Sequence, residues 1–179
     1  MRLILIICFL LVSGGMVLKA IPPISIEKSL SSEIKKTLGK ADFSLIPVLI
    51  PDKFKVNGKF YFINSGANEQ LKYAYFGRLI TDRSGNSVDS EVSDFLDYII
   101  FFSPLFQVLK VKIVRFNSTH GTEVCSPAWL KQFIGYTPAK SLMVGKNIDA
   151  ISGATATVNG ITFDIQSKTK ILNEIEGGK

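Results

Sequence analysis

Several short segments between residues 59 and 116 have the composition of β-strands, and they constrain the fold more than any other part of the sequence. Lys59–Asn64 and Lys72–Thr81 are rich in Phe, Tyr, Ile and Leu. Ser65–Asn68 lies between them and has the residues of a turn, so the two segments are expected to form a hairpin. A second turn is expected at Asp82–Asn86, which contains a Ser-Gly pair.

Two more strands are expected after this turn. Phe95–Phe102 is apolar enough to be a buried strand, and Pro104 ends it. Apolar and basic residues then alternate up to Phe116, which predicts a half-buried strand with one face toward the core. The alternating residues are Leu109, Val111 and Ile113 on one face and Lys110 and Lys112 on the other.

An amphipathic helix is expected on the N-terminal side of these strands. In Ser25–Gly39 apolar residues recur every four positions, and Gly39 supplies the stop. Phe43–Phe54 contains Pro47 and Pro51, so it cannot be a regular helix or a central strand and is expected to be an extended, packed connection. The recurring apolar residues of the helix are Ile26, Leu30, Ile34 and Leu38.

Two further helices are expected on the C-terminal side. The shorter helix has Ser126 as its candidate N-cap, Pro127 at its first position and Gly135 after its last turn. The longer helix follows Thr155 and carries one apolar stripe with a single gap, although Asn159-Gly160 weakens it locally. The stripe consists of Val158, Ile161, Ile165, Leu172 and Ile175.

These elements predict an α+β domain in which an antiparallel sheet has helices placed at its ends. The chain has 179 residues, 46% of them hydrophobic, which is ample for one packed core. We divide it into a targeting segment (1–20), an N-terminal helix with its connection (21–58) and a main domain (59–176).

The first twenty residues differ from the rest of the chain. Arg2 gives a short positive start, and Leu3–Val12 is an unbroken apolar run. This pattern predicts a secretory signal peptide, cleaved near Ala20 or near Gly14. The alternative is an uncleaved membrane anchor, because Leu3–Leu18 is only slightly shorter than a membrane span. In either case we expect the protein outside the cytoplasm, in the periplasm or on the outer face of the membrane.

The charge and cysteine content exclude several classes of protein. The formal net charge is +6, and Lys35-Lys36 is the only adjacent basic pair after the first twenty residues. A nucleic-acid partner is not expected, because it requires a basic stripe with interleaved aromatic residues. The charge is more consistent with solubility or with contact to an anionic membrane surface. Without residues 1–20, Cys125 is the only cysteine, so an internal disulfide is excluded.

The most specific motif is Asp-Ala-Ile-Ser-Gly-Ala-Thr at Asp149–Thr155. It places a hydroxyl at the expected start of a helix, where backbone N–H groups lack partners and the helix dipole is positive. A phosphate is favoured at such a place, and Gly153 and Ala154 leave room for a bulky group. Thr155 is therefore positioned to carry a phosphate-bearing cofactor through its side-chain oxygen.

The spacing of Asp149, Ser152, Gly153, Ala154 and Thr155 resembles the flavinylation motif of the FMN-binding domain family. Known members include the flavin-carrying subunits of sodium-pumping NADH:quinone reductase and of Rnf complexes. The resemblance implies that FMN is joined to Thr155 by a phosphodiester bond. It also implies a separate flavin transferase, which uses FAD and a divalent metal, with Thr155 as the nucleophile and Asp149 and Ser152 shaping the recognised segment.

Two more segments resemble parts of this family. His120, Gly121, Thr122 and Glu123 resemble its polar loop of His, acid and Thr, and Trp129–Phe133 resembles its Trp-x-x-Gln-Phe helix. The resemblance makes His120, Thr122, Glu123 and Trp129 candidate contacts of the flavin, with the Trp129 indole as a flat apolar surface for the isoalloxazine ring. Many pump subunits have Thr-Pro-Gly after the acid. Its absence here places the chain in a stand-alone branch.

These features predict an exported flavoprotein that carries electrons outside the cytoplasm, with redox proteins or a quinone as partners. The isoalloxazine ring performs the electron chemistry, and the protein fixes its position and tunes its potential. The chain needs no catalytic base of its own. It is better described as an electron-transfer protein than as an enzyme.

Other interpretations use the same residues. Ser152–Thr155 is also compatible with an ordinary turn in which Ser and Thr cap the helix, and the protein would then be a secreted binding module or inhibitor without a cofactor. A hydrolase built on His120 and Cys125 is disfavoured, because the two are only five positions apart and no nucleophile-elbow signature is present. A metal site has less support still, with one His and one Cys after processing.

Overall fold

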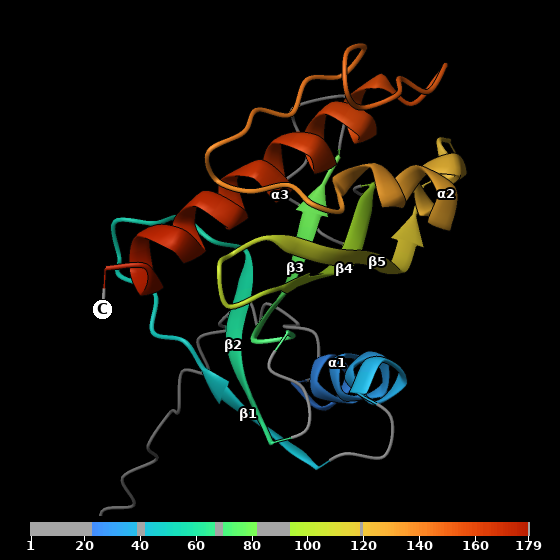
Figure 1. The fold of residues 1–179 in the computed structure, drawn as a ribbon. Helices are drawn as coiled ribbons and strands as arrows, with labels where there is room; N and C mark the ends of the chain where they lie inside the picture. Colours follow the sequence, from blue (N-terminus) through green and yellow to red (C-terminus); the bar gives the residue numbers. More distant parts are fainter. Residues whose placement is uncertain (1–22, 39–41, 67–69, 82–93, 119, 179) are drawn as a thin grey trace, which may run out of the picture.

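A five-stranded antiparallel sheet forms the centre of the domain (Figure 1). The computed structural model describes residues 23–38, 42–66, 70–81, 94–118 and 120–178, and the expected turn at Asp82–Asn86 lies outside them. Each strand pairs with the next one along the chain, so the predicted hairpin and antiparallel sheet are confirmed. The strands are β1 (Phe43–Pro47), β2 (Gly58–Ser65), β3 (Tyr73–Ile80), β4 (Phe95–Phe102) and β5 (Val108–Asn117).

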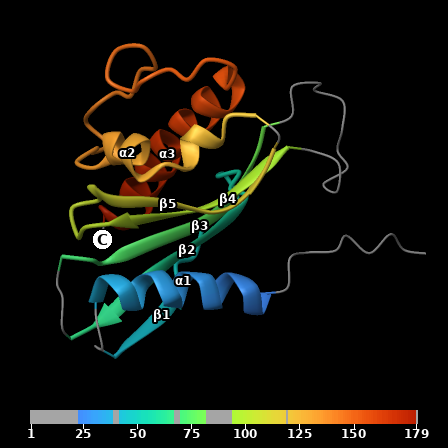
Figure 2. The same cartoon turned by 90° about the vertical axis from the view of Figure 1, so that its right-hand side faces the viewer.

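Helices cover both faces of the sheet rather than its ends (Figure 2). On one side lies α1, and on the other lie α2 and α3, so the domain has three layers. Every side chain of β4 is buried, so the sheet is covered on both faces at this strand. Helices provide that cover on each side. The helices are α1 (Pro23–Leu38), the 3₁₀ turn η1 (Thr122–Cys125), α2 (Pro127–Leu130), the 3₁₀ turn η2 (Lys131–Phe133) and α3 (Thr155–Glu176).

The predicted α1 is confirmed, and it packs through Leu30 and Ile34, which are fully buried. The proline-rich segment after it differs in part from the prediction, because its first five residues form the edge strand β1. Pro47 is tolerated at the last position of this edge strand, because the missing N–H group removes a hydrogen-bond donor only at the end of the strand. No helix within the described ranges is long and apolar enough to cross a membrane, and Leu3–Leu18 lies outside those ranges.

The alternation predicted for β5 is wrong at its first residue. Val108, Val111 and Ile113 face α3, whereas Leu109 packs with the cluster around α1. The cause is a shift of register, since Phe101 pairs with Lys110 but Phe102 pairs with Val108. Leu109 is the extra residue of this β-bulge, and a bulge reverses the face on which a side chain lies.

The predicted C-terminal helix is confirmed as α3, which continues through Asn159-Gly160 without a break. A Cβ added at Gly160 would lie 3.1 Å from the Leu79 Cδ2 atom, so the glycine lets the helix approach β3 closely. The gap in the apolar stripe is filled by Lys168 and Thr169, both of which are buried.

Lys168 belongs to a buried polar cluster that fastens α3 to the sheet. Its ammonium group is bound to the Asp164 carboxylate one helical turn earlier. The other oxygen of that carboxylate accepts a hydrogen bond from the Tyr98 hydroxyl of β4. Tyr75 of β3 packs beside Tyr98, with 5.7 Å between ring centroids. The charge of Asp164 is therefore compensated by a cation and a hydroxyl, as a buried carboxylate requires.

We expect this cluster to make the protein sensitive to alkaline pH. Burial raises the pKa of Tyr98 well above its ordinary value, and the neighbouring Tyr75 and Asp164 raise it further. Burial and the charge of Asp164 also raise the pKa of Tyr75. Both protons are therefore retained in the folded state at a pH where the unfolded chain has lost them. Stability is complete below about pH 10 and falls above it by about 1.4 kcal/mol per pH unit for each such tyrosine.

Urea unfolding measured between about pH 9 and pH 11 checks this expectation. Tyr98→Phe removes one of the two hydroxyls and should make the loss of stability with rising pH shallower. The same slope in the variant and in the natural chain would show that Tyr98 does not retain its proton.

Candidate functional site

The Ser-Gly-Ala-Thr motif lies at the start of α3, as predicted. Thr155 is the first residue of the helix, and its side chain is exposed. The N-cap position is taken by Ala154, and no side chain forms a capping hydrogen bond. The alternative in which Ser152 or Thr155 caps the helix is therefore not the arrangement that the structure has.

The backbone N–H groups of the first turn of α3 point out of the helix without carbonyl partners. The first bond of the helix runs from the Val158 N–H to the Ala154 carbonyl at 2.9 Å. The N–H groups of Thr155, Ala156 and Thr157 precede this bond and have no acceptor within the helix. They form the positive end of a 22-residue helix, beside the Thr155 hydroxyl.

Gly153 and Ala154 have different roles in the motif. Gly153 adopts a left-handed conformation with φ of 76°, which few other residues adopt. Nothing lies within 4 Å of the position where a Cβ would stand, so the approach to this side of the chain is open. Ala154 is buried and fixes the motif to the rest of the domain.

The contact of Ala154 brings the predicted His loop to the motif. A Cβ added at Gly121 would lie only 2.6 Å from the Ala154 Cβ atom. Gly121 has φ of 78° and is the residue that permits this close packing. The loop is fastened to the sheet through Ser118, whose hydroxyl donates to the Asp94 carboxylate at 2.9 Å and accepts from the His120 N–H at 3.3 Å.

The side chains of the His loop are exposed, including those of His120, Thr122 and Glu123. Thr122 and Glu123 begin the 3₁₀ turn η1, which was predicted as part of a loop. In the part of the chain that the structure describes, neither of them forms a hydrogen bond or an ion pair with Thr155. The loop thus packs against the motif through Gly121, while the side chains of Thr122 and Glu123 are exposed.

Trp129 serves the motif in a way that differs from the prediction. The side chain is 7% exposed and packs edge-on against Phe133, with 5.2 Å between ring centroids. Little of the indole face is therefore open to a flavin ring. Its Nε1–H group instead donates to the Asp149 carbonyl at 2.9 Å, which ties the motif to α2. The predicted N-cap Ser126 is confirmed and accepts the Trp129 N–H at 3.2 Å.

Gln132 contacts the motif directly, which the sequence alone did not indicate. Its side-chain oxygen accepts the Asp149 N–H at 2.7 Å, and its amide nitrogen donates to the Trp129 carbonyl at 3.1 Å. The carbonyl of Asp149 is thus held by Trp129 of α2, and its N–H by Gln132 of the adjoining turn η2. The Trp-x-x-Gln spacing was the available signal, but its purpose depends on a partner 17 positions further along the chain.

We expect Gln132→Met to loosen the motif while leaving the fold intact. The variant keeps the volume of the side chain and loses two hydrogen bonds, which costs about 1–3 kcal/mol. Hydrogen exchange of the Asp149 amide should become faster. Gln166→Met is the matched control, because Gln166 accepts the Leu142 N–H at 2.9 Å in the same connection. Faster exchange at Asp149 in both variants, or in neither, would contradict the assignment.

The interpretation as a cysteine hydrolase gains no support from the geometry. Burial raises the pKa of the Cys125 thiol, and the charge of Lys112 only partly opposes this effect. A raised pKa disfavours the thiolate that a nucleophile needs. Among the described residues, no group of three or more His, Cys, Asp or Glu side chains is placed to hold a metal ion.

No protein-family model matches this chain, and no curated protein matches it in sequence. The resemblance to the FMN-binding domain family therefore rests on the sequence motifs alone.

The residues present fit the phosphate end of FMN. An exposed hydroxyl, a row of backbone N–H groups with no acceptor within the helix, and free space at the Cβ position of Gly153 lie within three consecutive residues and the turn after them. This is a suitable place for a phosphate diester at the positive end of a helix. Of the predicted ring contacts, His120, Thr122 and Glu123 are exposed and belong to the loop that touches Ala154 through Gly121.

Proposed function

We propose that this protein is an exported electron carrier of the FMN-binding domain type, with FMN bound covalently to Thr155 through a phosphodiester bond. The observation that carries the proposal is the Thr155 hydroxyl, which is exposed at the first position of a helix that no side chain caps. A capped start would have used the N–H groups that a phosphate needs. The spacing from Asp149 to Thr155 adds the resemblance to the flavinylation motif.

Each residue of the site has a physical role in this proposal. Thr155 supplies the oxygen of the diester, and the first-turn N–H groups donate to the phosphate oxygens. Gly153 keeps the approach open, and Ala154 holds the helix start against Gly121. Trp129 and Gln132 hold the backbone of Asp149, so that the segment from Asp149 to Ser152 has a defined shape for a flavin transferase to recognise.

FMN bound at this place would supply reversible oxidation and reduction. The protein would fix the position of the flavin and shield it from loss. Covalent attachment suits a protein outside the cytoplasm, because a cofactor that dissociates there is lost by diffusion. Redox proteins or a quinone would donate and accept the electrons.

The test is to purify the full chain from a host that co-expresses a flavin transferase. We expect a yellow protein, an intact mass raised by one covalently bound FMN, and a band that fluoresces under ultraviolet light after denaturing electrophoresis. The intact mass also reports whether residues 1–20 are removed. A colourless protein, made beside a transferase that is shown to modify another substrate, would leave the binding module without cofactor as the better description.

A further inference from the structure

Every charged side chain in the five strands lies on the side of the sheet that faces α1. The register places Lys59 opposite Phe76, and Lys110 and Lys112 opposite Phe101 and Ile99, all of which belong to the α1 side. Side chains alternate along a strand, so the α3 side of the same strands is free of charged residues. The charged strand residues are Lys59, Arg78, Asp97, Lys110, Lys112 and Arg115.

Helix α1 adds more positive charge to this side of the domain. Lys28 and Lys35 are exposed and lie seven residues apart, so they share one face of the helix. Lys36 is exposed beside them. Among the side chains that the structure describes, the α1 side carries eight cations and three carboxylates, whereas the rest of the domain carries eight and seven. The net positive charge of the described side chains is therefore concentrated on one side.

Two of the three carboxylates on this side are buried and held by cations. The Glu33 side chain is 9% exposed and lies 2.7 Å from Lys36 and 3.4 Å from Lys110. Burial alone would raise the pKa of Glu33, yet the hydrogen bonds and charges of the two lysines bring it below its ordinary value. The Asp97 side chain is 5% exposed and lies between Arg78 at 2.7 Å and Arg115 at 3.8 Å.

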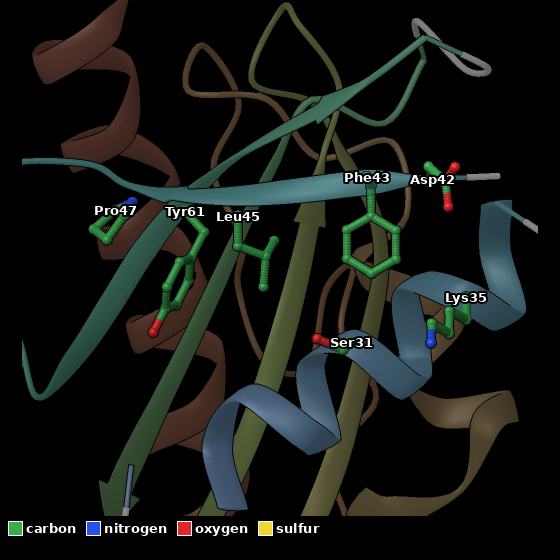
Figure 3. Close-up of a pocket in the computed structure, with 7 residues that line it drawn as sticks. All are labelled: Ser31, Lys35, Asp42, Phe43, Leu45, Pro47 and Tyr61. Carbon is green, nitrogen blue, oxygen red and sulfur yellow. The ribbon is translucent and has the colours of Figure 1, made fainter. Parts of the chain in front are cut away.

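The outer surface of the α1 side is consequently cationic. Lys28, Lys35, Lys59 and Lys112 form no ion pair with any carboxylate of the described residues. A hollow of about 460 Å³ opens between α1 and β1 (Figure 3). Its walls carry Ser31 and Lys35 from α1, Phe43, Leu45 and Pro47 from β1, and the side chains of Asp42 and Tyr61. Because the Asp42 carboxylate shares this hollow with Lys35, the attraction to lipid phosphates comes from the exposed lysines around the hollow rather than from the hollow itself.

The position of α1 in the chain points to the same partner. The apolar run Leu3–Leu18 ends four residues before Pro23, where α1 begins. Where this run is retained as the uncleaved membrane anchor, the four connecting residues span at most about 14–18 Å, so α1 begins close to the bilayer. Cationic side chains within about 8–10 Å of an anionic surface are attracted to it at physiological salt.

We propose that the α1 side of this domain rests on a membrane surface that contains anionic phospholipids. The lysines of α1 and of the sheet then lie toward the lipid phosphates, with Lys35 and Ser31 at the hollow beside β1. Both views of the fold place the start of α3 on the layer remote from α1 (Figures 1 and 2). The Thr155 site is therefore turned away from the bilayer, toward partners in the aqueous phase.

The test uses the full chain, including residues 1–22, inserted in nanodiscs. One set of nanodiscs contains phosphatidylcholine alone, and the other also contains phosphatidylglycerol. Mass spectrometry measures how fast each lysine reacts with a water-soluble acylating reagent. Lys28 and Lys35 should react about fivefold more slowly in the anionic nanodiscs, because each lysine near such a surface gains about that factor in bound population. Lys131 and Lys170 on the α3 side should react equally in both sets.

A double variant, Lys28→Gln with Lys35→Gln, separates charge from tethering. Both side chains are exposed and form no ion pair with another described residue, so the fold should be unchanged by circular dichroism. The population held on the anionic surface should fall roughly 25-fold, and Lys59 should lose its protection. Lys131→Gln with Lys170→Gln removes the same charge from the opposite side and should leave Lys59 protected.

Three results would overturn the proposal. The first is equal reaction rates of Lys28 and Lys35 in neutral and anionic nanodiscs. The second is protection that persists at about 1 M salt, where the screening length is about 3 Å. The third is protection by a soluble acidic peptide with none from anionic lipid, which would assign the surface to a protein partner. None of these measurements depends on flavin being present.

Discussion

Thr155→Val is expected to abolish covalent flavin attachment completely and to leave the fold unchanged. Valine has the shape of threonine and lacks the side-chain oxygen that the phosphodiester bond needs. The Thr155 side chain is exposed and caps nothing, so its loss should change the free energy of unfolding by less than about 0.5 kcal/mol. Intact mass measures the flavin, and thermal unfolding measures the stability.

Controls for this variant come from other hydroxyls of the same region. Ser141→Ala removes an exposed hydroxyl from the connection before the motif and should retain the full flavin mass. Ser152→Ala keeps the Thr155 hydroxyl that receives the flavin, so this variant should still take up flavin. Uptake should be slower if Ser152 shapes the segment that the flavin transferase recognises. A flavin mass on Thr155→Val would mean that a different residue carries the cofactor.

The start of α3 could be predicted from the sequence because its signals are local. An apolar stripe begins just after Thr155, and the preceding Gly153 interrupts helical structure. The same holds for the short helix, whose start is marked by Ser126 and Pro127. These signals lie within a few residues of the features that they specify, and both predicted starts are confirmed.

The contacts that complete the site could not be predicted, because they join residues far apart in the sequence. Gly121 meets Ala154 across 33 positions, and Trp129 meets the Asp149 carbonyl across 20. Both contacts depend on how the loop after β5 and the connection before α3 pack on the same side of the sheet. The bulge at Leu109 was missed for a similar reason, since an extra residue in a strand is set by its partner strand.

The gap in the apolar stripe of α3 was visible in the sequence, but its meaning was not. Lys168 occupies a core position and would be unfavourable there alone. Asp164 stands four residues earlier, which is the spacing of a helical ion pair. The third member, Tyr98, comes from β4, 66 positions away, and only the folded structure brings it to the carboxylate.

Asp164→Ala is expected to lower the free energy of unfolding by about 3–5 kcal/mol. The substitution leaves the buried Lys168 ammonium without its counter-charge and the Tyr98 hydroxyl without its acceptor. Domains of this size have total stabilities of about 5–15 kcal/mol, so the loss is a large fraction of the whole. The midpoint of thermal unfolding should fall by roughly 2–4 °C for each kcal/mol.

A matched control on the same helix separates this effect from the loss of any ion pair. Glu174→Ala breaks the pair between Glu174 and Lys53, whose side chains are 56% and 62% exposed. An exposed pair of this kind contributes about 0–1 kcal/mol, so this variant should unfold close to the natural chain. Equal losses in Asp164→Ala and Glu174→Ala would show that the buried cluster has no special weight.

The double variant Asp164→Ala with Lys168→Met tests the physical cause of the loss. Methionine fills the position of Lys168 without a charge, so no unpaired ion remains in the core. The double variant should therefore recover much of the stability that Asp164→Ala loses, which is a coupling of the kind seen between residues in contact. Destabilisation that simply adds would instead point to lost packing. The Asp164 cluster lies more than two helical turns from Thr155. Asp164→Ala should therefore still accept flavin when it is kept below its unfolding temperature. Thr155→Val should show the opposite behaviour, a stable protein without flavin.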